Sequence, residues 1–434
     1  MRTPRHYQYI AIARGTQQNL LLADQMGLGK SLVGIETAKA LFPKLNAAAL
    51  VVCPKGIRAQ WQAMIEDQDP GAIVLIFDNN VESLHKHISD LDYIITHYEA
   101  VVKHIERLNR FTYSTLIIDE AHRIKNRKSL RTKAVKKLKA YRKLALTGTA
   151  WDKDPSEIWS ILHFLAPHQF TSYWQFLDRH VQFDVNFLGF PENPRLKSPR
   201  DFANEIAPHV LQRKKREVMP ELPPLIQTHI PIDLGAKQRV AYDRIKKIVD
   251  MEVDLLDFGR DPLQITNILT KLTRLLQVAS NPQLLDIKAP SAKFDWLLEW
   301  LHDNATTPVL IYTRYRRNVE ALGRLLPNAA CVASGIKPAK PLAAYSTVVA
   351  TIAALGEGYD LGHLDTAIYI DCEWSSILMQ QSIERIDRGS NTESKNIIFL
   401  QATNTVDDLM RQALNRKLST KQIVENYLQA VSVS

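Results

Sequence analysis

The sequence predicts an α/β protein with two parallel-sheet lobes in tandem. Short apolar runs alternate with helix-length segments in both halves of the chain, which is typical of a parallel sheet with crossover helices. Two consecutive prolines, Pro223 and Pro224, separate the halves, because paired prolines cannot continue a helix. A chain of 434 residues also exceeds the usual size of one hydrophobic core.

The first lobe is expected at residues 1–150. Its apolar runs are separated by polar segments long enough to form helices, and each run has the length of a buried strand. We expect a parallel sheet made of Leu20–Ala23, Leu50–Val52, Ile73–Phe77, Tyr93–Thr96, Leu116–Asp119 and Lys143–Leu146.

Two segments around the lobe junction lose this alternation. Residues 151–222 are rich in aromatic residues and helical in pattern, with interrupting prolines, so we expect a helical insertion of the first lobe. Residues 223–290 begin with a strand-like run at Ile226–Ile230 and are helical in pattern from about Ala236 to Leu276. This segment is expected to be a linker strand followed by a helical insertion of the second lobe.

The second lobe is expected at residues 291–434. It repeats the alternation of apolar runs and helix-length segments, which again favours a parallel sheet. The predicted strands are Val309–Tyr312, Thr347–Thr351, Ala367–Ile370 and Asn396–Leu400.

A glycine-containing loop, residues 24–31, follows the first predicted strand and precedes a helical stretch. Such a loop wraps a phosphate chain with its backbone N–H groups and the following helix N-terminus. Lys30 would reach the β- and γ-phosphates, and the Ser31 hydroxyl would bind magnesium. Asp24 stands where the strict pattern has Gly, and the alternative is an ordinary Gly-rich turn. The second lobe has no such loop, which suggests a nucleotide bound between the lobes.

Two adjacent carboxylates, Asp119 and Glu120, follow the apolar run Leu116–Ile118. Ligands of open α/β sheets bind at the carboxyl ends of the strands, where these side chains would point. One carboxylate can hold a divalent metal while the other polarises a water for attack on a phosphoryl group. The alternative is that the acids cap the next helix. Together with the phosphate loop, they favour a nucleotide triphosphatase.

Composition restricts the class of protein and of partner. Hydrophobic residues make up 45% and charged residues 23% of the chain, as in ordinary soluble proteins. We expect neither a membrane span nor a signal peptide. The three cysteines lack metal-ligand spacing, so we expect reduced thiols in a cytosolic compartment. The net charge of +9 favours a polyanionic partner.

The basic residues gather in one run without acids, from Arg123 to Lys143. Within it, Leu130, Ala134, Leu138 and Tyr141 recur at helical spacing, which predicts a helix with one buried stripe and a cationic outer face. A solvated helix face, the alternative, normally mixes both signs of charge. We expect nucleic acid to contact Arg123, Lys125, Lys136, Lys137 and Lys139. A second basic cluster, 213–216, favours a structural or phosphate-facing role.

Taken in order, the motifs resemble those of the Swi/Snf-type ATPases, a branch of the superfamily-two helicase-like translocases. The matches in the first half are Tyr7-Gln8, Asp24 to Ser31 ("DEMGLGKT"), Val51 to Trp61 (motif Ia), Asp119 to Asn126 (motif II), Leu146 to Ala150 (motif III) and Ala207 to Val218 with Leu222-Pro223-Pro224. Those in the second half are Ser280 to Leu285, Ile311 to Tyr315 (motif IV), Gly356 to Leu361 (motif V), and Trp374, Gln381, Arg385 and Arg388 (motif VI).

The resemblance implies two RecA-like lobes and a role for each matching residue. Gln8 would read adenine, Ser31 and Asp119 would hold magnesium, and Glu120 would orient the attacking water. The catalytic Lys30 would share the nucleotide contacts with Asp24, Met26, Gly27, Leu28, Gly29, Ser31, Gly358 and Asp360. Arg385 and Arg388, three apart and so on one helical face, would be arginine fingers supplied by the second lobe. DNA would contact Lys55, Arg58, Thr313, Arg314 and Trp374.

Several positions depart from the family pattern. Leu355 replaces a glycine of motif V, motif VI ends Asp387-Arg388-Gly389-Ser390-Asn391, and Asp152-Lys153 follows motif III where Gln and Asn are usual. The segment from Ala333 to Tyr345 is short and lacks the usual basic stretch. These changes concern the DNA contact of the second lobe and its coupling to hydrolysis.

We therefore expect a monomeric DNA-dependent ATPase that uses ATP and magnesium and moves along double-stranded DNA by lobe closure, with little base readout. The alternatives are a strand-separating helicase acting on DNA or RNA, and a non-enzymatic nucleotide-gated clamp. The clamp would lack the catalytic Lys, Glu or Arg, and all three are present. We expect a cytoplasmic protein of prokaryotic or viral origin, or a nuclear one in a eukaryote, without a membrane partner.

Overall fold

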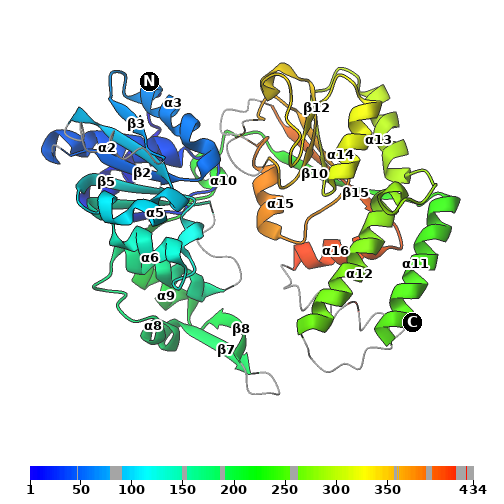
Figure 1. Ribbon diagram of the computed structural model, residues 1–434, viewed down its shortest axis with the longest axis horizontal. Helices are drawn as coiled ribbons and strands as arrows, with labels where there is room; N and C mark the ends of the chain where they lie inside the picture. The colour runs from blue at the N-terminus through cyan, green and yellow to red at the C-terminus, as the bar shows by residue number, and fades with distance from the viewer. Residues whose placement is uncertain are drawn as a thin grey trace. The chain divides into compact units, whose positions relative to one another are not determined.

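A parallel sheet of seven strands lies at the centre of the first of two units, Met1–Glu221 and Leu222–Ser434, that make up the computed structural model (Figure 1). The structure describes residues 1–45, 47–78, 90–148, 154–185, 191–254, 262–355, 359, 361–387, 393–416 and 427. The predicted fold class, two parallel-sheet α/β lobes with added helices, is confirmed.

The strands of unit 1 are parallel, in the order β3-β4-β2-β5-β6-β1-β9. Successive side chains alternate between the faces, so that Leu20 and Leu22 belong to one hydrophobic cluster and Leu21 to the other. This is the two-residue period of a strand buried on both faces. The bounds are β1 Leu20–Leu22, β2 Ala49–Cys53, β3 Val74–Ile76, β4 Tyr93–His97, β5 Thr112–Asp119, β6 Lys139–Leu146 and β9 Val210–Leu211.

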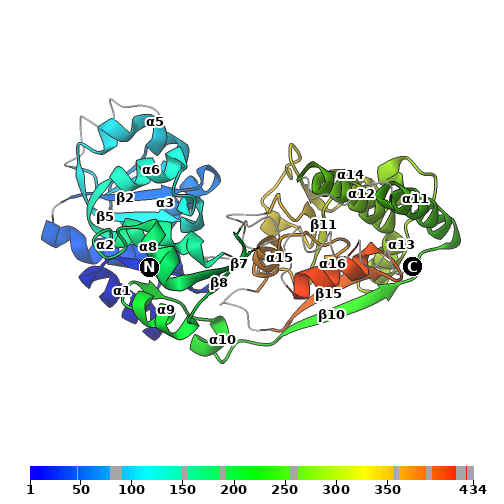
Figure 2. The ribbon, with the colours of Figure 1, turned by 90° about the horizontal axis from the view of Figure 1, so that it is seen from below.

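Helices cover both faces of this sheet. Apolar side chains of α1 (His6–Gln17), α2 (Lys30–Leu45) and α3 (Arg58–Gln68) pack on one face. Those of α5 (Tyr98–Leu108), α6 (Leu130–Lys137), α7 (Trp159–Leu165) and α9 (Pro199–Ile206) pack on the other. Figure 2 shows α1 and α5 on opposite sides of the sheet. Because β1, β6 and β5 are neighbouring parallel strands, their carboxyl ends meet at one edge of the sheet.

The predicted basic helix between Arg123 and Lys143 is wrong in its extent. Ser129 caps α6 by accepting the amide of Thr132, and the helix ends at Lys137. The chain then pairs with β5 from Lys139 onward. Leu130 is 73% exposed and Tyr141 52% exposed, so only Ala134 and Leu138 of the predicted apolar stripe are buried. Strand pairing overrides the helical spacing because Leu144 and Leu146 belong to the sheet core.

The insertion after motif III is helical only in part. It contains the helices α7, α8 (Tyr173–His180), α9 and α10 (Lys215–Val218), but also an antiparallel pair, β7 (Val181–Val185) with β8 (Pro191–Leu196). Prolines that interrupt a helical pattern are tolerated in a strand with a free edge. Pro191 and Pro194 therefore mark strand β8 and not helix breaks.

Unit 2 has a six-stranded parallel sheet in the order β10-β15-β14-β11-β13-β12. Its strands are β10 Leu225–Ile232, β11 Val309–Thr313, β12 Ala330–Val332, β13 Thr347–Thr351, β14 Thr366–Tyr369 and β15 Lys395–Ala402. Its helices are α11 Ala236–Asp254, α12 Pro262–Ser280, α13 Ala292–Asp303, α14 Arg316–Leu325, α15 Ser376–Ile383 and α16 Val406–Asn415. The edge strand β12 was not predicted. Within the described residues, no helix has the length and apolarity needed to cross a membrane.

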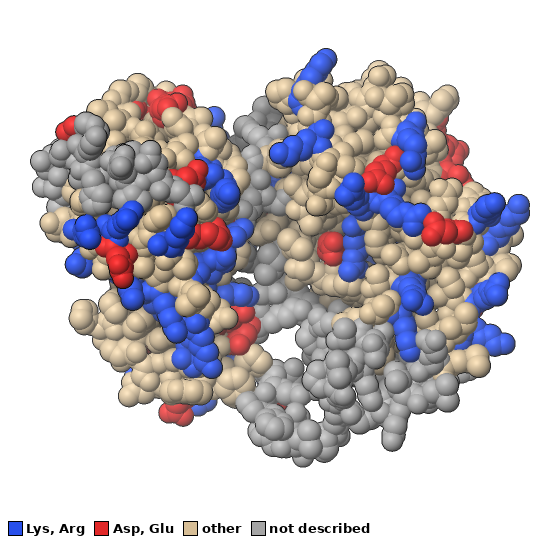
Figure 3. Space-filling model, viewed as in Figure 1, with Lys and Arg blue, Asp and Glu red and all other residues tan. Residues whose placement is uncertain are grey.

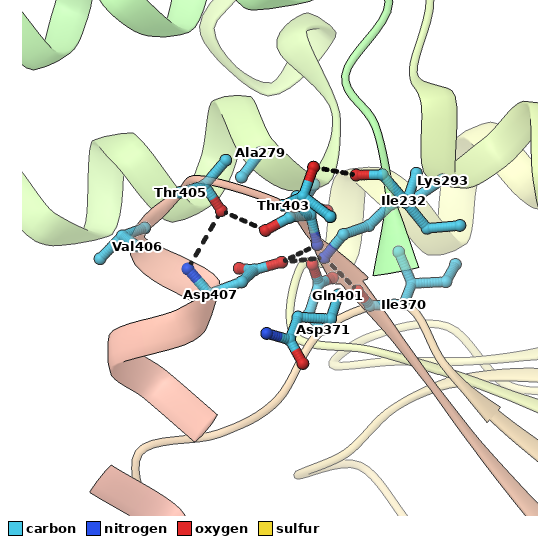
Figure 4. A network of polar contacts seen from close by, with 12 residues as sticks. Ile232, Ala279, Lys293, Ile370, Asp371, Gln401, Thr403, Thr405, Val406 and Asp407 are labelled. Carbon is cyan, nitrogen blue, oxygen red and sulfur yellow. Dashed lines mark hydrogen bonds and ion pairs between the residues drawn. The ribbon is translucent and has the colours of Figure 1, made fainter. Parts of the chain in front are cut away.

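A buried ion pair ties the elements of unit 2 together (Figure 4). Lys293 of α13 is 1% exposed, and its Nζ donates to Asp407 Oδ2 at 2.6 Å and to the carbonyl of Ile370 at 2.8 Å. Asp407 Oδ2 also accepts the amide of Ala402 at 3.0 Å. Burial by itself lowers the pKa of Lys293, but the carboxylates of Asp407 and Asp371 outweigh it and hold that pKa above its usual value. One contact thus fixes α13 and α16 at the ends of β14 and β15.

We predict that Lys293→Met destabilises unit 2 by about 3–5 kcal/mol, because it leaves the carboxylate of Asp407 buried without its cation. The double variant Lys293→Met/Asp407→Leu should recover part of this loss, since no buried charge remains. Urea unfolding of the full chain would measure both, with the exposed Lys288→Met as the matched control. A Lys293→Met midpoint equal to that of the control would contradict the assignment.

Candidate active site

The phosphate loop has the backbone that its two glycines allow. It joins β1 to α2, and Gly27 and Gly29 have φ angles of 84° and 75°, where other residues are strained. A Cβ on Gly29 would also lie 2.3 Å from Nε2 of Gln8. Lys30, the first residue of α2, donates its Nζ to the carbonyl of Asp24 at 2.7 Å. Its ammonium thus lies inside the loop.

The neighbours of the loop are the other residues predicted to bind nucleotide. Gln8 is 5% exposed, and both ends of its amide are engaged: Nε2 donates to Leu28 O at 2.9 Å and Oε1 accepts the amide of Arg5 at 2.8 Å. Met26 lies beside Gly148, where a Cβ would come within 2.9 Å of its Cγ. Ser31 is the second residue of α2. Gln8 therefore supports the loop through both ends of its amide.

The acidic pair forms a left-handed turn at the end of β5. Glu120 has φ 52° and ψ 55°, a conformation that costs a residue other than glycine about 1–3 kcal/mol. Three contacts hold it there. The amide of Glu120 donates to Asp119 Oδ1 at 2.9 Å, and the buried hydroxyl of Tyr98 donates to the carbonyl of Asp119 and, at 3.4 Å, to that of Glu120. Hydrogen bonds therefore fix the backbone of the acidic pair.

The second oxygen of Asp119 is held from the other face of the sheet. Trp61 of α3 is fully buried, and its Nε1 donates to Asp119 Oδ2 at 2.8 Å. Burial, followed by the charge of Glu120, raises the pKa of Asp119 to about 6, while the bond from Trp61 and the charge of Lys30 act against this rise. Nδ1 of His122 lies 3.1 Å from Oε2 of Glu120.

Asp24, the departure from the strict loop pattern, is one half of a buried ion pair. It is 1% exposed, and Arg213 donates Nε to its Oδ1 at 3.0 Å and Nη2 to its Oδ2. Nη1 of Arg213 donates to the carbonyl of Tyr7. A planar guanidinium suits such a two-pronged contact. Asp24 therefore binds the protein and is not directed at phosphate.

The residues around Arg213 run along the phosphate loop as a strap, which we define as residues 209–215. The strand β9 pairs with β1, and the amides of Ala23 and Gln25 donate to the carbonyls of Leu211 and Arg213 at 2.8 and 3.0 Å. Lys215 is 3% exposed, and its amide donates to Gln25 Oε1 at 2.9 Å. The basic cluster at 213–216 thus has a structural role in part, and unit 1 ends six residues beyond the strap.

The predicted nucleic-acid residues of motif Ia lie in different environments. Lys55 is exposed at the start of a short 3-10 turn, Lys55–Ile57, that leads into α3. Arg58 has a side chain only 14% exposed; it pairs with Asp78, and its Nε donates to the carbonyl of Lys55 at 2.9 Å. Burial, followed by the charge of Arg58, lowers the pKa of His97 beside this pair. Lys55 is therefore accessible to a partner, whereas the guanidinium of Arg58 is largely occupied by contacts within the protein.

The basic residues after the acidic pair also fall into two groups, some exposed and others in contact with the protein. Lys137 and Lys139 are exposed, and Lys and Arg side chains gather on the face of unit 1 that carries α6 (Figure 3). Lys136 instead lies 4.8 Å from the ring centre of Trp159, and burial lowers its pKa to about 8. Lys125 pairs with Glu157 at 2.7 Å. Arg123 and Lys125 line a groove with Glu99, His122, Asn126, Ser129 and Leu130.

In unit 2 the structure brings two of the predicted DNA contacts together and buries the third. The guanidinium of Arg314 lies 5.7 Å from the ring centre of Trp374 and 3.5 Å from Oε2 of Glu373. Thr313 is fully buried, and its hydroxyl donates to Asp371 Oδ2 at 2.6 Å while accepting the amide of Tyr315. The structure therefore argues against Thr313 as a direct contact.

Arg385, one of the two predicted arginine fingers, does not lie in a helix. Helix α15 ends at Ile383, and Arg385 follows it in a turn, 4% exposed. Arg388, together with the predicted nucleotide contacts Gly358 and Asp360, lies outside the described residues. The helical-spacing argument for the two arginines is therefore wrong for Arg385.

Three side chains that position the site were not predicted from sequence: Trp61, Tyr98 and Arg213. Trp61 ends the motif Ia match and Arg213 belongs to a basic cluster already noticed, but neither partner could be inferred. Both contacts join residues far apart in the chain, 58 positions for Trp61 and Asp119 and 189 for Arg213 and Asp24. Only the sheet order makes them neighbours.

Comparison with known proteins gives a family. A model described as the SNF2-related domain matches residues 9–284. The human SWI/SNF-related matrix-associated actin-dependent regulator of chromatin subfamily A member 1 is 27% identical over 94% of this chain and 42% of its own length. An uncharacterised ATP-dependent helicase of Mycoplasma genitalium is 23% identical over 98% of this chain and 42% of its own length. The chain thus spans less than half the length of these relatives.

A solved structure shows a similar fold. The Pyrococcus furiosus Hef helicase domain has a TM-score of 0.61 at 14% identity and covers 94% of this chain and 98% of that one. The Sulfolobus solfataricus SWI2/SNF2 ATPase core, solved in complex with dsDNA, has a TM-score of 0.48 at 22% identity and covers 100% of this chain and 95% of that one.

We predict that Arg213→Met releases the strap from the phosphate loop, because Asp24 would remain buried without its cation, at a cost of about 3–5 kcal/mol. Trypsin cleavage after Lys214 and Arg216 should accelerate by at least about tenfold, since local opening controls proteolysis. The matched control is Lys133→Met, which removes an exposed cation of unit 1 that lies outside the strap. Cleavage as slow as in that control would contradict the role given to Arg213.

Proposed function

Because the chain belongs to the SNF2-related family of ATP-dependent enzymes, we propose that it hydrolyses ATP in response to double-stranded DNA and moves along the duplex. One observation carries the hydrolytic half of this proposal. The phosphate loop and the acidic pair follow β1 and β5, which flank β6 in a parallel sheet. Lys30 is close enough to lower the pKa of Asp119. A phosphate chain on the loop would therefore end beside both carboxylates.

Each side chain at this edge has a distinct proposed role. Lys30 binds the β- and γ-phosphates, and Glu120, the second carboxylate of the pair, orients the attacking water. Gly27, Leu28 and Gly29 present the loop backbone to phosphate. Gly148 allows Met26 and Lys30 to approach β6, since a Cβ there would lie 2.9 Å from Met26 and 3.9 Å from Lys30 Nζ.

The residues present fit a magnesium ion. Mg²⁺ binds proteins through one or two oxygen ligands and completes its shell with substrate phosphates and water. Asp119 and Ser31 supply such a pair, and the described residues contain no group of three or more His, Cys, Asp or Glu side chains that could hold a metal alone. The ion would neutralise charge that develops on the phosphoryl oxygens. Asp119 is partly buried, and burial raises its pKa, so a nearby cation would favour its ionised form.

Unit 2 would complete the site on lobe closure. We assign Arg385 and Arg388 as arginine fingers and Gly358 and Asp360 as nucleotide contacts, from their motif positions. Arg385 is 4% exposed, so this assignment requires the turn after α15 to rearrange when ATP binds. Hydrolysis would then depend on the motion of one lobe against the other.

The DNA contact we propose is to the phosphate backbone. The exposed cations Lys55, Lys137 and Lys139 in unit 1, and the paired Arg314 and Trp374 in unit 2, supply charge and a stacking surface but few groups arranged for base edges. Arg123 and Lys125 would extend this surface along the groove that begins at His122.

Glu120→Gln should bind ATP within a few-fold of the wild type and lose turnover by about 100- to 10,000-fold, because the amide cannot accept a proton from water. Fluorescent-nucleotide binding and steady-state hydrolysis would measure the two effects. Glu99→Gln, which removes a carboxylate paired with Arg131, is the control. Near-normal turnover of Glu120→Gln would refute its assignment.

The polynucleotide that stimulates hydrolysis tests the function as a whole. We expect duplex DNA to raise the ATPase rate more than single-stranded DNA or RNA does. Lys137→Gln/Lys139→Gln should reduce the slope of log affinity against log salt by about 2, roughly 0.9 for each lost phosphate contact. Lys136→Gln is the matched control, because Lys136 packs on Trp159 and should affect stability only. Stimulation by RNA alone, or unwinding of a tailed duplex, would favour a strand-separating helicase.

A further inference from the structure

We propose that Trp61 is a positioning residue through which helix α3 transmits DNA contact to the catalytic carboxylates. This inference rests on the proposed function and adds the route by which DNA changes the rate. Three observations carry it: the contact of Trp61 with Asp119, the position of Trp61 in α3, and the contacts at the start of that helix.

The contact with Asp119 is well suited to orient a carboxylate. One oxygen, Oδ1, accepts the amide of Glu120 at 2.9 Å, and the other, Oδ2, accepts the indole N–H of Trp61 at 2.8 Å. The amide belongs to the turn itself, so Trp61 is the side chain that sets the rotation of the group. An indole donates only and does not titrate, and a bond to an ionised acceptor is stronger than a neutral one.

Trp61 cannot move independently of α3. It is fully buried and lies in the first turn of the helix, within the hydrophobic cluster that includes Ile57, Ile65 and Ile117. Close-packed interiors transmit displacement because they hold few voids. A small shift of the first turn therefore displaces the indole, and with it the oxygen of Asp119.

The start of α3 is where DNA is proposed to bind. Lys55 is exposed three residues before Arg58, and Arg58 links the two parts because its Nε donates to the carbonyl of Lys55 at 2.9 Å while its guanidinium pairs with Asp78. Arg58 in turn precedes Trp61 by three residues, the spacing of neighbours on one helical face. A phosphate that competes with Asp78 for Arg58, or pulls on Lys55, acts on the turn that carries Trp61.

This arrangement gives the carboxylates a shorter connection to DNA than the basic helix α6 does. Between Glu120 and α6 lie a 3-10 turn and the segment 125–129, and two cations of this region, Lys125 and Lys136, contact Glu157 and Trp159 of the insertion. Trp61 instead contacts the carboxylate of Asp119 directly. We therefore assign α6 to DNA affinity and α3 to DNA stimulation.

Trp61→Phe tests the route, because it keeps an aromatic ring in the core and removes the N–H donor. The ratio of DNA-stimulated to basal hydrolysis should fall by about tenfold, the usual effect of losing a hydrogen bond to a charged group. DNA affinity, measured by fluorescence anisotropy, should stay within about twofold of the wild type. The half-saturating magnesium concentration with DNA present should rise.

Trp159→Phe is the matched control. Trp159 is also a buried tryptophan of unit 1, and its indole N–H has no hydrogen-bond partner among the described residues. A purely structural effect of Trp61→Phe would lower basal and stimulated rates by the same factor, and that result would overturn the proposal. An unchanged stimulation ratio would overturn it as well.

A measurement on the wild type keeps the proposal testable if Trp61→Phe does not fold. Coupling between sites is reciprocal, so saturating duplex DNA should lower the magnesium concentration needed for half-maximal binding of a fluorescent ADP analogue. No change in that concentration would overturn the proposed route. Absence of any DNA stimulation in the wild type would instead refute the proposed function itself.

Discussion

The left-handed turn at Asp119-Glu120 is the constraint on which the site depends. Asp119 and Glu120 carry like charges side by side, and the charge of Glu120 adds to burial in raising the pKa of Asp119. The left-handed backbone of Glu120 costs strain that Tyr98 and the Asp119 side chain offset by hydrogen bonds. We propose different roles for the two carboxylates, one toward metal and one toward water. Trp61 joins this turn to α3, so the turn is fixed from both faces of the sheet.

The phosphate loop is held by a second long-range contact of comparable importance. Asp24 stands where the strict loop pattern has a glycine. Its carboxylate forms an ion pair with Arg213, and this pair joins the loop to the strap. The strap lies only a few residues before the boundary at Glu221. A change in the loop on nucleotide binding would therefore reach the chain that leads to unit 2 through backbone and side-chain bonds. This gives a physical role to the segment Ala207 to Val218, which the sequence shows only as a motif match.

Much of the fold could be predicted from sequence, because buried parallel strands are short apolar runs between helices. Every strand expected in the two sheets is present, with ends that differ by up to a few residues. The errors arose where local pattern and tertiary pairing disagree. The run to Lys143 is helix-like in spacing, but from Lys139 onward it belongs to strand β6, and Pro191 and Pro194 lie in an antiparallel strand pair. Lys30, Asp119 and Glu120 could be found from motif and position. The residues that hold them in place could not be found, because Trp61 and Arg213 contact partners far away in the sequence. The burial of Thr313 and Lys136 could not be predicted either, because it depends on tertiary packing and not on the spacing of residues in the sequence.

The indole N–H of Trp61 offers the most direct measurement of the central claim, that the acidic turn is held and adjusted from α3. In protein labelled with ¹⁵N-tryptophan, the resonance missing from Trp61→Phe identifies this group. We predict that it exchanges slowly with solvent, shifts when magnesium and ADP bind, and shifts again when duplex DNA is added. A Trp61 indole resonance that exchanges freely and responds to neither ligand would contradict the account.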